Sequence, residues 1–584
     1  MIFVDPSGDD AGPGTAERPF ATLERARDAA APGDVVQLRA GTYRLADTFR
    51  LSAEHSGVSY QAYGFGTGTQ EEVVLSGGRR VTGWTAGADG THRAELPGPA
   101  PRQLYVRGRR AERSSVPLAD QGLVRTADGY TVDGTGPQSW RGDVEIVYRG
   151  AYPWSEARCP VASVSGDARS TTIEMARPAF ERAARLYHWV ISWQSPDATD
   201  TGGEDAYAVD SPTSAENSPA FLTDGTFATE GTVVHLRPHR ADELDDVVAP
   251  VLETLVHARG AHDIAFRGIT FAEATWRHPS SPMGFLHYHG NGYDDGTGDL
   301  QVITFAEGQG QVTVPTGEAS IPGNVLFEDC SRVTLAGCRF TRLGGVALEF
   351  RGAGTGNAVL GGEISEIAGG GLVIGAGARE HRVADTRVHR IGLDYHGSPA
   401  VLVTGSDGTV IAHNEIRELP HAGIVVYEGR GTQVLNNLVH DTMRVLADGG
   451  GIYLSGPQGG SYASGALVRG NVVRDTVTPW NFALYPDYGA AWVTVQGNIV
   501  QRADKAAALE VSPPQRHVAF VGNLWDADPG PAPAGTLLAD NRVLPADAFD
   551  TDPVAADIAA AAGPRPPREH AAGDEHAAAR AGGE

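Results

Sequence analysis

Cysteine is scarce in this sequence of 584 residues, where it occurs only as Cys159, Cys330 and Cys338. A small, odd number of cysteines does not make a disulfide framework, and we expect three buried free thiols. Long apolar runs are also missing, because no stretch reaches the ~20 apolar residues of a membrane-spanning helix. The opening Met1-Ile2-Phe3-Val4-Asp5 has neither the basic nor the apolar segment of a secretory signal. The chain as written is therefore expected to be cytoplasmic, and secreted if its true start lies elsewhere.

Positive charge is in short supply, with 47 Lys and Arg against 72 Asp and Glu and a formal net charge of −25. A strongly acidic protein repels polyphosphates and anionic lipid headgroups, so we expect neither nucleic acid nor a membrane as partner. Glycine and proline, by contrast, are abundant at 75 and 36 residues. This composition favours many short strands joined by turns over long helices.

The common catalytic and metal-binding motifs are absent as well. The sequence has no His-Glu-x-x-His, no P-loop, no Cys-x-x-Cys and no Gly-x-Ser-x-Gly. The acidic stretch Asp294-Asp295-Gly296-Thr297-Gly298-Asp299 lacks the spaced ligands and the distal Glu of an EF-hand loop, and it is interpreted as a solvated loop. We therefore expect no metal site and no cofactor.

An internal repeat runs from about residue 324 to 527. Each copy has a β-branched run, then a small or amide residue, then a second apolar pair. The middle position falls on Cys338, Gly362, Thr386, Asn414, Asn437, Asn471, Asn498 and Asn523, with gaps of 24, 24, 28, 23, 34, 27 and 25 residues. Short runs separated by Gly, Asp or Asn at this period are typical of the coils of a parallel β-helix. The gaps of 28 and 34 residues predict loops that bulge from a coil and build binding sites.

The asparagines at the repeat position have a structural interpretation. Asn tolerates the left-handed backbone that a tight bend between strands needs. Stacked amide side chains also bond to one another from coil to coil. We therefore expect Asn414, Asn437, Asn471, Asn498 and Asn523 to form a ladder along the solenoid.

Four segments follow from where the repeat is present. Residues 1–70 are expected to form an N-terminal cap and the first coils, with Thr22 as N-cap of a helix over residues 23–30. A cap of this kind covers the open strand edge of the solenoid. The repeat is lost over residues 71–255, which predicts an inserted β-rich domain, and residues 256–530 form the main β-helix. Residues 531–584 are a C-terminal extension, expected to be disordered after about residue 563.

Several stretches resemble one known family. They are Gln103-Leu104-Tyr105-Val106-Arg107-Gly108, Ala215-Glu216-Asn217-Ser218, Gly268-Ile269-Thr270-Phe271 with Trp276, Asp448-Gly449-Gly450-Gly451-Ile452-Tyr453 and Leu484-Tyr485-Pro486-Asp487. Together with an opening that resembles pectate-lyase-like caps, they are similar to glycoside hydrolase family 141, over roughly residues 1–530. The family includes α-L-fucosidase and xylanase activities. The resemblance implies an all-β, right-handed parallel β-helix that hydrolyses a fucoside- or xylose-containing glycan.

The resemblance also implies which residues are catalytic. By motif position, the two aspartates proposed for the family fall on Asp448 and Asp487. The sequence departs from the family at Gly225-Thr226-Phe227-Ala228, where relatives often have Gly-Glu-Trp-Tyr. The departure concerns substrate contacts from the insertion and does not touch the aspartates.

Glycosidic cleavage needs two carboxyl groups across one bond, roughly 5 Å apart for retention and 6.5–9.5 Å for inversion. Neighbouring coils lie about 4.8 Å apart, so one coil plus a lateral step separates Asp448 from Asp487 by very roughly 5–10 Å. The glycines after Asp448 leave room for a sugar ring to approach the backbone. Other side chains on nearby coils are expected to bind substrate, namely Glu428, Tyr453, Tyr485, Trp480, His396 and His421.

Two other functions stay open at this point, and the expected partner in every case is an oligo- or polysaccharide. A calcium-dependent polysaccharide lyase needs an acidic metal cluster and a base beside a uronate, and Arg444 is the basic residue nearest in sequence to either aspartate. A non-catalytic glycan-binding β-helix would use the aromatic side chains and not the aspartates.

Overall fold

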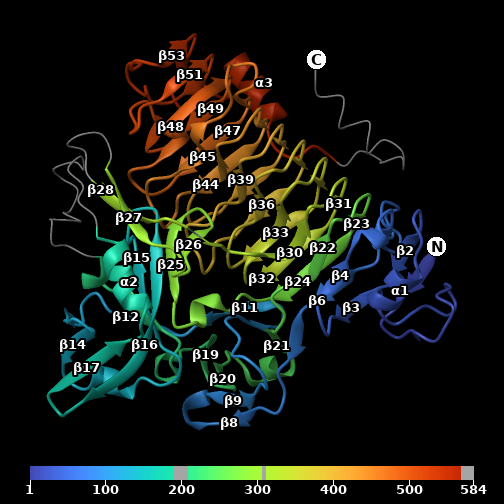
Figure 1. The fold of residues 1–584 in the computed structure, drawn as a ribbon, viewed down its shortest axis with the longest axis vertical. Helices are drawn as coiled ribbons and strands as arrows, with labels where there is room; N and C mark the ends of the chain where they lie inside the picture. Colours follow the sequence, from blue (N-terminus) through green and yellow to red (C-terminus); the bar gives the residue numbers. More distant parts are fainter. Residues whose placement is uncertain (189–207, 305–310, 318, 567–584) are drawn as a thin grey trace.

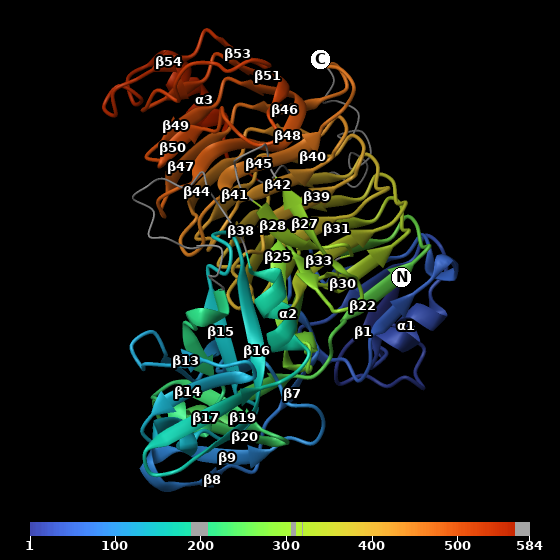
Figure 2. The same ribbon diagram turned by 60° about the vertical axis from the view of Figure 1, so that its left-hand side comes forward.

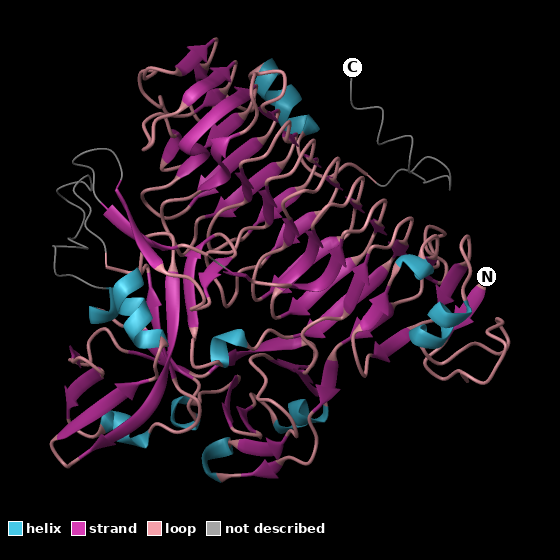
Figure 3. Ribbon diagram, viewed as in Figure 1, coloured by secondary structure: helices cyan, strands magenta, loops and turns pink. Residues whose placement is uncertain are grey.

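The computed structural model describes residues 1–188, 208–304, 311–317 and 319–566. Their backbone forms one long solenoid of short parallel strands, with a β-rich body against its side (Figure 1). Strands dominate, and the few helices are short and peripheral (Figure 3). Parallel strands joined in succession almost always wind right-handed. Among the described residues, no helix is long and apolar enough to span a membrane.

Three columns of parallel strands form the faces of the solenoid. The first face, which carries the candidate site, consists of β4 (Phe49–Leu51), β22 (Val256–Arg259), β30 (Gly323–Glu328), β33 (Val346–Arg351), β36 (Leu372–Ile374), β39 (Val401–Thr404), β42 (Ile424–Tyr427), β45 (Gly450–Pro457), the start of β48 (Phe482–Gln496) and β50 (Lys505–Ala507).

The second face continues from the first around a tight bend. It consists of β1 (Ile2–Val4), β2 (Val35–Leu38), β5 (Ser59–Ala62), β23 (Ala265–Arg267), β31 (Thr334–Ala336), β34 (Ala358–Leu360), β37 (Arg382–Ala384), β40 (Val410–Ala412), β43 (Gln433–Leu435), β46 (Ala466–Arg469), the end of β48, β51 (Arg516–Val521) and β53 (Thr536–Ala539). Because β48 pairs with both β45 and β46, it passes from the first face to the second without a break.

The third face closes each coil. It consists of β3 (Gly41–Arg44), β6 (Val73–Ser76), β24 (Ile269–Ala274), β32 (Arg339–Leu343), β35 (Glu363–Ile367), β38 (Arg387–His389), β41 (Glu415–Arg417), β44 (Leu438–Thr442), β47 (Val472–Thr476), β49 (Ile499–Gln501), β52 (Leu524–Trp525) and β54 (Arg542–Val543). Inward aliphatic and aromatic side chains of the three faces form one continuous core. The predicted all-β parallel β-helix is thus confirmed.

The asparagine ladder is confirmed, but its backbone differs from the prediction. The Nδ2 of Asn414 donates to Oδ1 of Asn437 at 2.9 Å, and the same 2.9 Å bond repeats up the stack to Asn541. The left-handed residue at each bend is the one before the asparagine, such as His413 at φ 56° or Asn436 at φ 51°. The ladder asparagines therefore serve through their amides, which bond carbonyls and amides of neighbouring coils.

A short helix covers the N-terminal end, as predicted. In α1 (Leu23–Ala29) the hydroxyl of Thr22 accepts a hydrogen bond from the backbone N–H of Arg25. Leu23 and Ala26 turn into the solenoid core. Cys159, Cys330 and Cys338 are buried free thiols, as expected.

The inserted segment starts later than residue 71, because β6 still pairs with β3 and β24. Its first sheet consists of β7 (Gly78–Arg80), β21 (Val247–Pro250), β10 (Leu104–Val106), β11 (Arg109–Arg113), β19 (Thr226–Glu230), β20 (Val233–Arg237), β9 (His92–Glu95) and β8 (Thr85–Ala86). The second consists of β12 (Ser115–Pro117), β18 (Ser214–Glu216), β15 (Glu145–Arg149), β16 (Glu156–Gly166), β17 (Ser170–Met175), β14 (Gly129–Asp133) and β13 (Val124–Arg125), with α2 (Ala179–Leu186) against it.

An excursion from the solenoid joins this insertion. It contributes β25 (Phe285–His289), β26 (Gly292–Asp294) and β29 (Ala319–Ser320) to the second sheet, and β27 (Leu300–Thr304) with β28 (Gln311–Pro315) as a separate hairpin. β25 pairs with β16, and both views place this pair alongside the first face (Figure 2). In the acidic stretch at 294–299, Asp294 is buried and forms an ion pair with Arg182, whereas Gly296, Thr297 and Asp299 are exposed, as expected for a solvated loop.

The C-terminal segment differs from the predicted extension. The solenoid continues through β53 and β54, and α3 (Pro553–Ala561) then packs beside the core residues Val472, Ile499 and Leu524. Beyond residue 563, Arg565 still forms an ion pair with Asp385 at 2.6 Å. The rest of the predicted disordered tail, residues 567–584, lies outside the described residues.

Candidate active site

The first face brings Asp448 and Asp487 together. Asp448 stands two residues before β45, and Asp487 lies within β48 on the next coil. In the register of the two strands, Tyr453 pairs with Tyr485 and Ser455 pairs with Asp487. In the same register Ile452 pairs with Leu484.

Two tyrosines of these strands hold the aspartates. The Tyr485 hydroxyl donates to Oδ1 of Asp448 at 2.7 Å, and the Tyr453 hydroxyl donates to Oδ2 of Asp487 at 2.9 Å. Their ring centroids are 5.1 Å apart in an edge-to-face contact. Burial, and then the nearby carboxylates, raise the pKa of both phenols well above its usual range. Both tyrosines therefore remain hydroxyl donors.

The carboxyl groups have unusual acidity. Burial, and then the negative charge of Asp487, raise the pKa of Asp448 far above that of an ordinary aspartate. Burial also raises the pKa of Asp487, although hydrogen bonds from the Tyr488 amide, Tyr453 and Tyr485 oppose the shift. Both side chains keep some solvent exposure. The pair is therefore placed to share one proton near neutral pH, as coupled carboxyl groups do.

The backbone around Asp448 is fixed by the adjacent coil and by the insertion. Asp448 has a left-handed φ of 51°, and its N–H donates to the carbonyl of Trp480 at 2.9 Å. The N–H of Ala447 donates to the carbonyl of Pro153, at 2.9 Å, in the inserted domain. The insertion thus helps to position the loop that carries the first aspartate.

The glycines after Asp448 allow neighbouring segments to pack closely against this loop and strand. A Cβ on Gly449 would come within 2.6 Å of His421 Nε2, and one on Gly450 within 2.7 Å of the Phe482 carbonyl. On Gly451 it would meet Val473 at 2.4 Å. A side chain at any of these three positions would therefore collide with its neighbours.

The other predicted binding residues divide into two groups. Tyr453 and Tyr485 contact the aspartates directly, and the backbone of the half-buried Trp480 faces Asp448. His421 lies beneath them, with Nε2 3.1 Å from the Ala447 carbonyl, and burial lowers its pKa to about 4.

His396 and Glu428 are not joined to the pair by any bond among the described residues. His396 Nδ1 lies 2.8 Å from the buried Glu156 of the insertion. Glu428 is exposed at the end of β42, where the register puts Tyr427 and not Glu428 in phase with Asp487. Because a strand alternates its faces, a side chain one residue out of phase with Asp487, as Glu428 is, points to a different side.

Three further residues belong to the site but were missed in the sequence. His289, from β25 of the excursion, bonds the Tyr427 hydroxyl and lies 5.7 Å from Tyr453 between ring centroids. Burial, and then His421, lower the pKa of His289 to about 3. Lys505 acts on Asp448 electrostatically. Only the rarity of lysine could have singled out Lys505, and no local signal indicated His289 or Tyr427.

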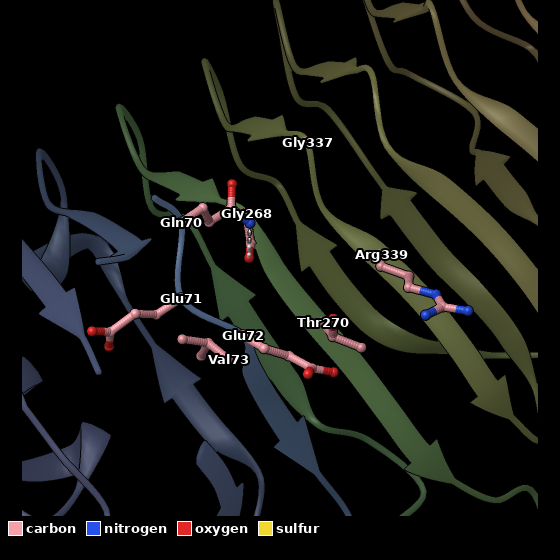
Figure 4. A pocket seen from close by; sticks show the side chains of 8 residues that line it. All are labelled: Gln70, Glu71, Glu72, Val73, Gly268, Thr270, Gly337 and Arg339. Atoms are coloured by element: carbon pink, nitrogen blue, oxygen red, sulfur yellow. Dashed lines mark hydrogen bonds between the residues drawn. The ribbon is translucent and has the colours of Figure 1, made fainter. Parts of the chain in front are cut away.

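A different pocket, of about 300 Å³, lies at the N-terminal end of the solenoid. Its lining residues span three consecutive coils and include Glu71, Glu72 and Arg339 (Figure 4). Glu71 is already paired with Arg39 at 2.9 Å, and the hydrogen bonds from Arg39 lower its pKa. Its lining residues include neither Asp448 nor Asp487, whose raised pKa makes the first face the better catalytic candidate. Within the described part of the chain, no three His, Cys, Asp or Glu side chains converge as a metal site would need.

Comparison with known proteins agrees with this architecture. The sequence model of the family described as "Right handed beta helix region" matches residues 318–465 and 361–523. A solved structure titled "Glycoside hydrolase" superposes with a TM-score of 0.70 at 22% identity, covering 97% of this chain and 98% of that one. At 22% identity, this structural likeness shows the fold alone. The chain is a right-handed parallel β-helix protein with an inserted β-rich domain.

Two weaker likenesses were also found. The structure titled "The complex structure of XylC with xylose" superposes with a TM-score of 0.45 at 14% identity, covering 90% of this chain and 75% of that one. The uncharacterized protein YwoF of Bacillus subtilis (strain 168) is 40% identical over 76 residues. That match spans 13% of this chain and 15% of the relative.

Proposed function

We propose that this protein is a glycoside hydrolase that uses Asp448 and Asp487 as its carboxyl pair. The observation that carries the proposal is the pair itself, two aspartates of raised pKa on adjacent coils, each bonded by a tyrosine hydroxyl. Two carboxyl groups that share one proton supply the acid and the base or nucleophile of glycosidic cleavage. The substrate class is a fucoside- or xylose-containing glycan.

The environments of the two carboxyl groups assign their roles. Asp487 accepts hydrogen bonds from Tyr453 and the Tyr488 amide, and Tyr485 also lowers its pKa. Asp487 therefore holds the negative charge. Asp448 is opposed by that charge and keeps the proton. Asp448 then protonates the leaving glycosidic oxygen, while Asp487 attacks the anomeric carbon or activates water.

The Tyr485 hydroxyl donates to Asp448 at 2.7 Å and also lowers the pKa of Asp487, so this one phenol lies close to both carboxyl groups. Two carboxyl groups this near to one side chain suit glycosidic cleavage, whose retaining and inverting courses need separations of roughly 5 Å and 6.5–9.5 Å.

The decisive experiment is a screen of aryl glycosides and plant oligosaccharides with the wild type, Asp448→Asn and Asp487→Asn. We expect reducing ends to appear without an unsaturated product, and both variants to lose at least about 10³-fold in kcat. Asp441→Asn is the matched control, since Asp441 is partly exposed and pairs with His440 away from the site. Cleavage that survives in both site variants, or that yields an unsaturated product, would refute the proposal.

A further inference from the structure

The single lysine of the sequence stands at the rim of the carboxyl pair. Lys505 is the only lysine in the 584 residues, and all other members of the 47 Lys and Arg are arginines. It begins β50 and pairs in register with Phe482, at the start of the strand that carries Asp487. Its side chain is exposed. A cation is therefore presented to solvent one coil beyond the catalytic residues.

Aromatic contacts orient this ammonium toward the site. Lys505 Nζ lies 5.2 Å from the centroid of the Phe482 ring, within cation–π range. The Phe482 ring lies 4.3 Å from that of Tyr485, whose hydroxyl bonds Asp448. Lys505 is also close enough for its charge to lower the pKa of Asp448.

The Lys505 ammonium has no anionic partner among the described residues. Within the described part of the chain, Lys505 forms no ion pair with a carboxylate. The adjacent Asp504 is directed elsewhere, because its Oδ2 accepts from the backbone amides of Trp480 and Asn481, at 2.7 and 3.3 Å. Nearby Arg502, in contrast, is paired with Asp475. An unpaired cation beside an acidic site is available to an anion from outside.

We propose that Lys505 binds an anionic group on the substrate, so that the glycan cleaved here carries a carboxylate or sulfate on the sugar beside the scissile bond. This inference rests on the proposed hydrolase function and narrows its substrate class to acidic glycans. An ammonium is a point charge with three donors, which suits either anion. It also offsets the repulsion that the acidic site exerts on an acidic sugar.

Matched neutral and acidic substrates test the proposal. We compare xylo-oligosaccharides with and without glucuronate branches, and fuco-oligosaccharides with and without sulfate, using wild type, Lys505→Met and Lys505→Arg. The wild type should favour one acidic series by about tenfold in kcat/KM, as one charge-assisted contact allows. Lys505→Met should reduce that ratio to about 1, and Lys505→Arg should retain part of it. Whichever series shows the preference identifies the anion as carboxylate or sulfate.

Arg18→Met is the control for net charge, because Arg18 is exposed in the N-terminal region, far along the chain from the site. It removes the same charge and should leave the acidic preference intact. The proposal for Lys505 is overturned if the wild type has an acidic-to-neutral kcat/KM ratio near 1, or if Lys505→Met leaves that ratio unchanged. Hydrolysis of the neutral series in either case would still support the proposed hydrolase function.

Chemical modification gives a second, independent measurement. With one lysine, an amine-acylating reagent has two targets, Lys505 and the N-terminal amine, which peptide mapping resolves. Acidic oligosaccharides should slow acylation of Lys505 at least threefold, and neutral ones should not. The N-terminal amine, paired with Asp34, serves as internal control. Protection of Lys505 without hydrolysis of any substrate would refute the hydrolase function but support the anion site. If neither protection nor hydrolysis is seen, the hydrolase function and the anion site are both refuted.

Discussion

Burial raises the pKa of both Asp448 and Asp487, and the negative charge of Asp487 raises that of Asp448 further. The hydroxyls of Tyr453 and Tyr485 partly oppose those effects by stabilising the charged forms. The working pH of the site should therefore be set by four side chains on two adjacent strands.

At the residue scale, we expect both limbs of the pH profile of kcat/KM to lie above the ordinary aspartate pKa of about 3.9. Tyr485→Phe removes a donor that lowers the pKa of both aspartates, so both limbs should move to higher pH. The rate should also fall, by about 10- to 100-fold. Tyr462→Phe, at an exposed position, is the control. Limbs that stay in place would contradict the assigned contacts.

The raised pKa of Asp448 should also affect the stability of the folded protein. A carboxyl group whose folded pKa exceeds its unfolded value destabilises the folded state as pH rises through the window between the two values. Neutral pH lies near the top of that window, since the folded pKa of Asp448 is about 7, so most of the penalty is present there. Asp448→Asn should therefore raise stability at neutral pH by on the order of 1 kcal/mol, measured as a higher thermal midpoint. The gain should vanish below pH 3.8, where the wild-type carboxyl is protonated in both states. A variant less stable than wild type at neutral pH would contradict this account.

At the element scale, the asparagine ladder joins successive coils at one bend. Each central amide bonds the asparagine of the next coil and a strand carbonyl, as Asn471 does with Asn498 and Val434. These groups are buried, so their bonds are not replaced by water when one member is lost.

We therefore expect Asn471→Ala to lower stability by about 2–4 kcal/mol, since it leaves the Asn437 amide and the Val434 carbonyl without partners. Asn541→Ala, at the half-buried end of the ladder, should cost less than half as much. Thermal unfolding followed by circular dichroism measures both. Equal losses would show that the ladder acts through something other than its buried amides.

At the scale of the whole molecule, buried ion pairs fasten the insertion to the solenoid. Glu156 of β16 accepts from the His396 backbone at 3.0 Å and lies 2.8 Å from His396 Nδ1. It also bonds Arg158 at 3.0 Å, and Arg110 of β11 pairs with Asp394. Because Pro153 and His289 come from this same body of the protein, docking of the insertion also shapes the catalytic side of the first face.

Acid should loosen this junction. Burial raises the pKa of Glu156, but His396 and Arg158 outweigh it and hold the pKa well below its usual range. A carboxylate whose folded pKa is depressed contributes stability above its unfolded pKa of 4.5 and loses it as pH falls further. Glu156→Gln should therefore flatten the acid limb of stability and cost about 3–5 kcal/mol at neutral pH. The matched control is Glu174→Gln, an exposed strand position. An unchanged acid limb would refute the role of Glu156.

The sequence by itself determined the scaffold and the positions of the aspartates. A repeat near 25 residues with an amide at one bend is compatible with few folds, since each coil must present the same face to the next. The two long gaps contain His396, which bonds Glu156 of the insertion, and Asp448, which belongs to the site. The repeat also placed Asp448 and Asp487 on adjacent coils.

Tertiary structure decided what surrounds those aspartates. The strand register puts Tyr427, and not the next residue Glu428, in phase with Asp487. Since alternate side chains of a strand face opposite ways, this difference of one residue decides which of the two side chains faces the site. His289 reaches the site from a hairpin far along the chain, and Lys505 reaches it from the next coil. Periodicity carries information about what repeats within a strand or coil. Contacts made by an insertion docking on the outside of the solenoid have no period, so only the folded chain could show them.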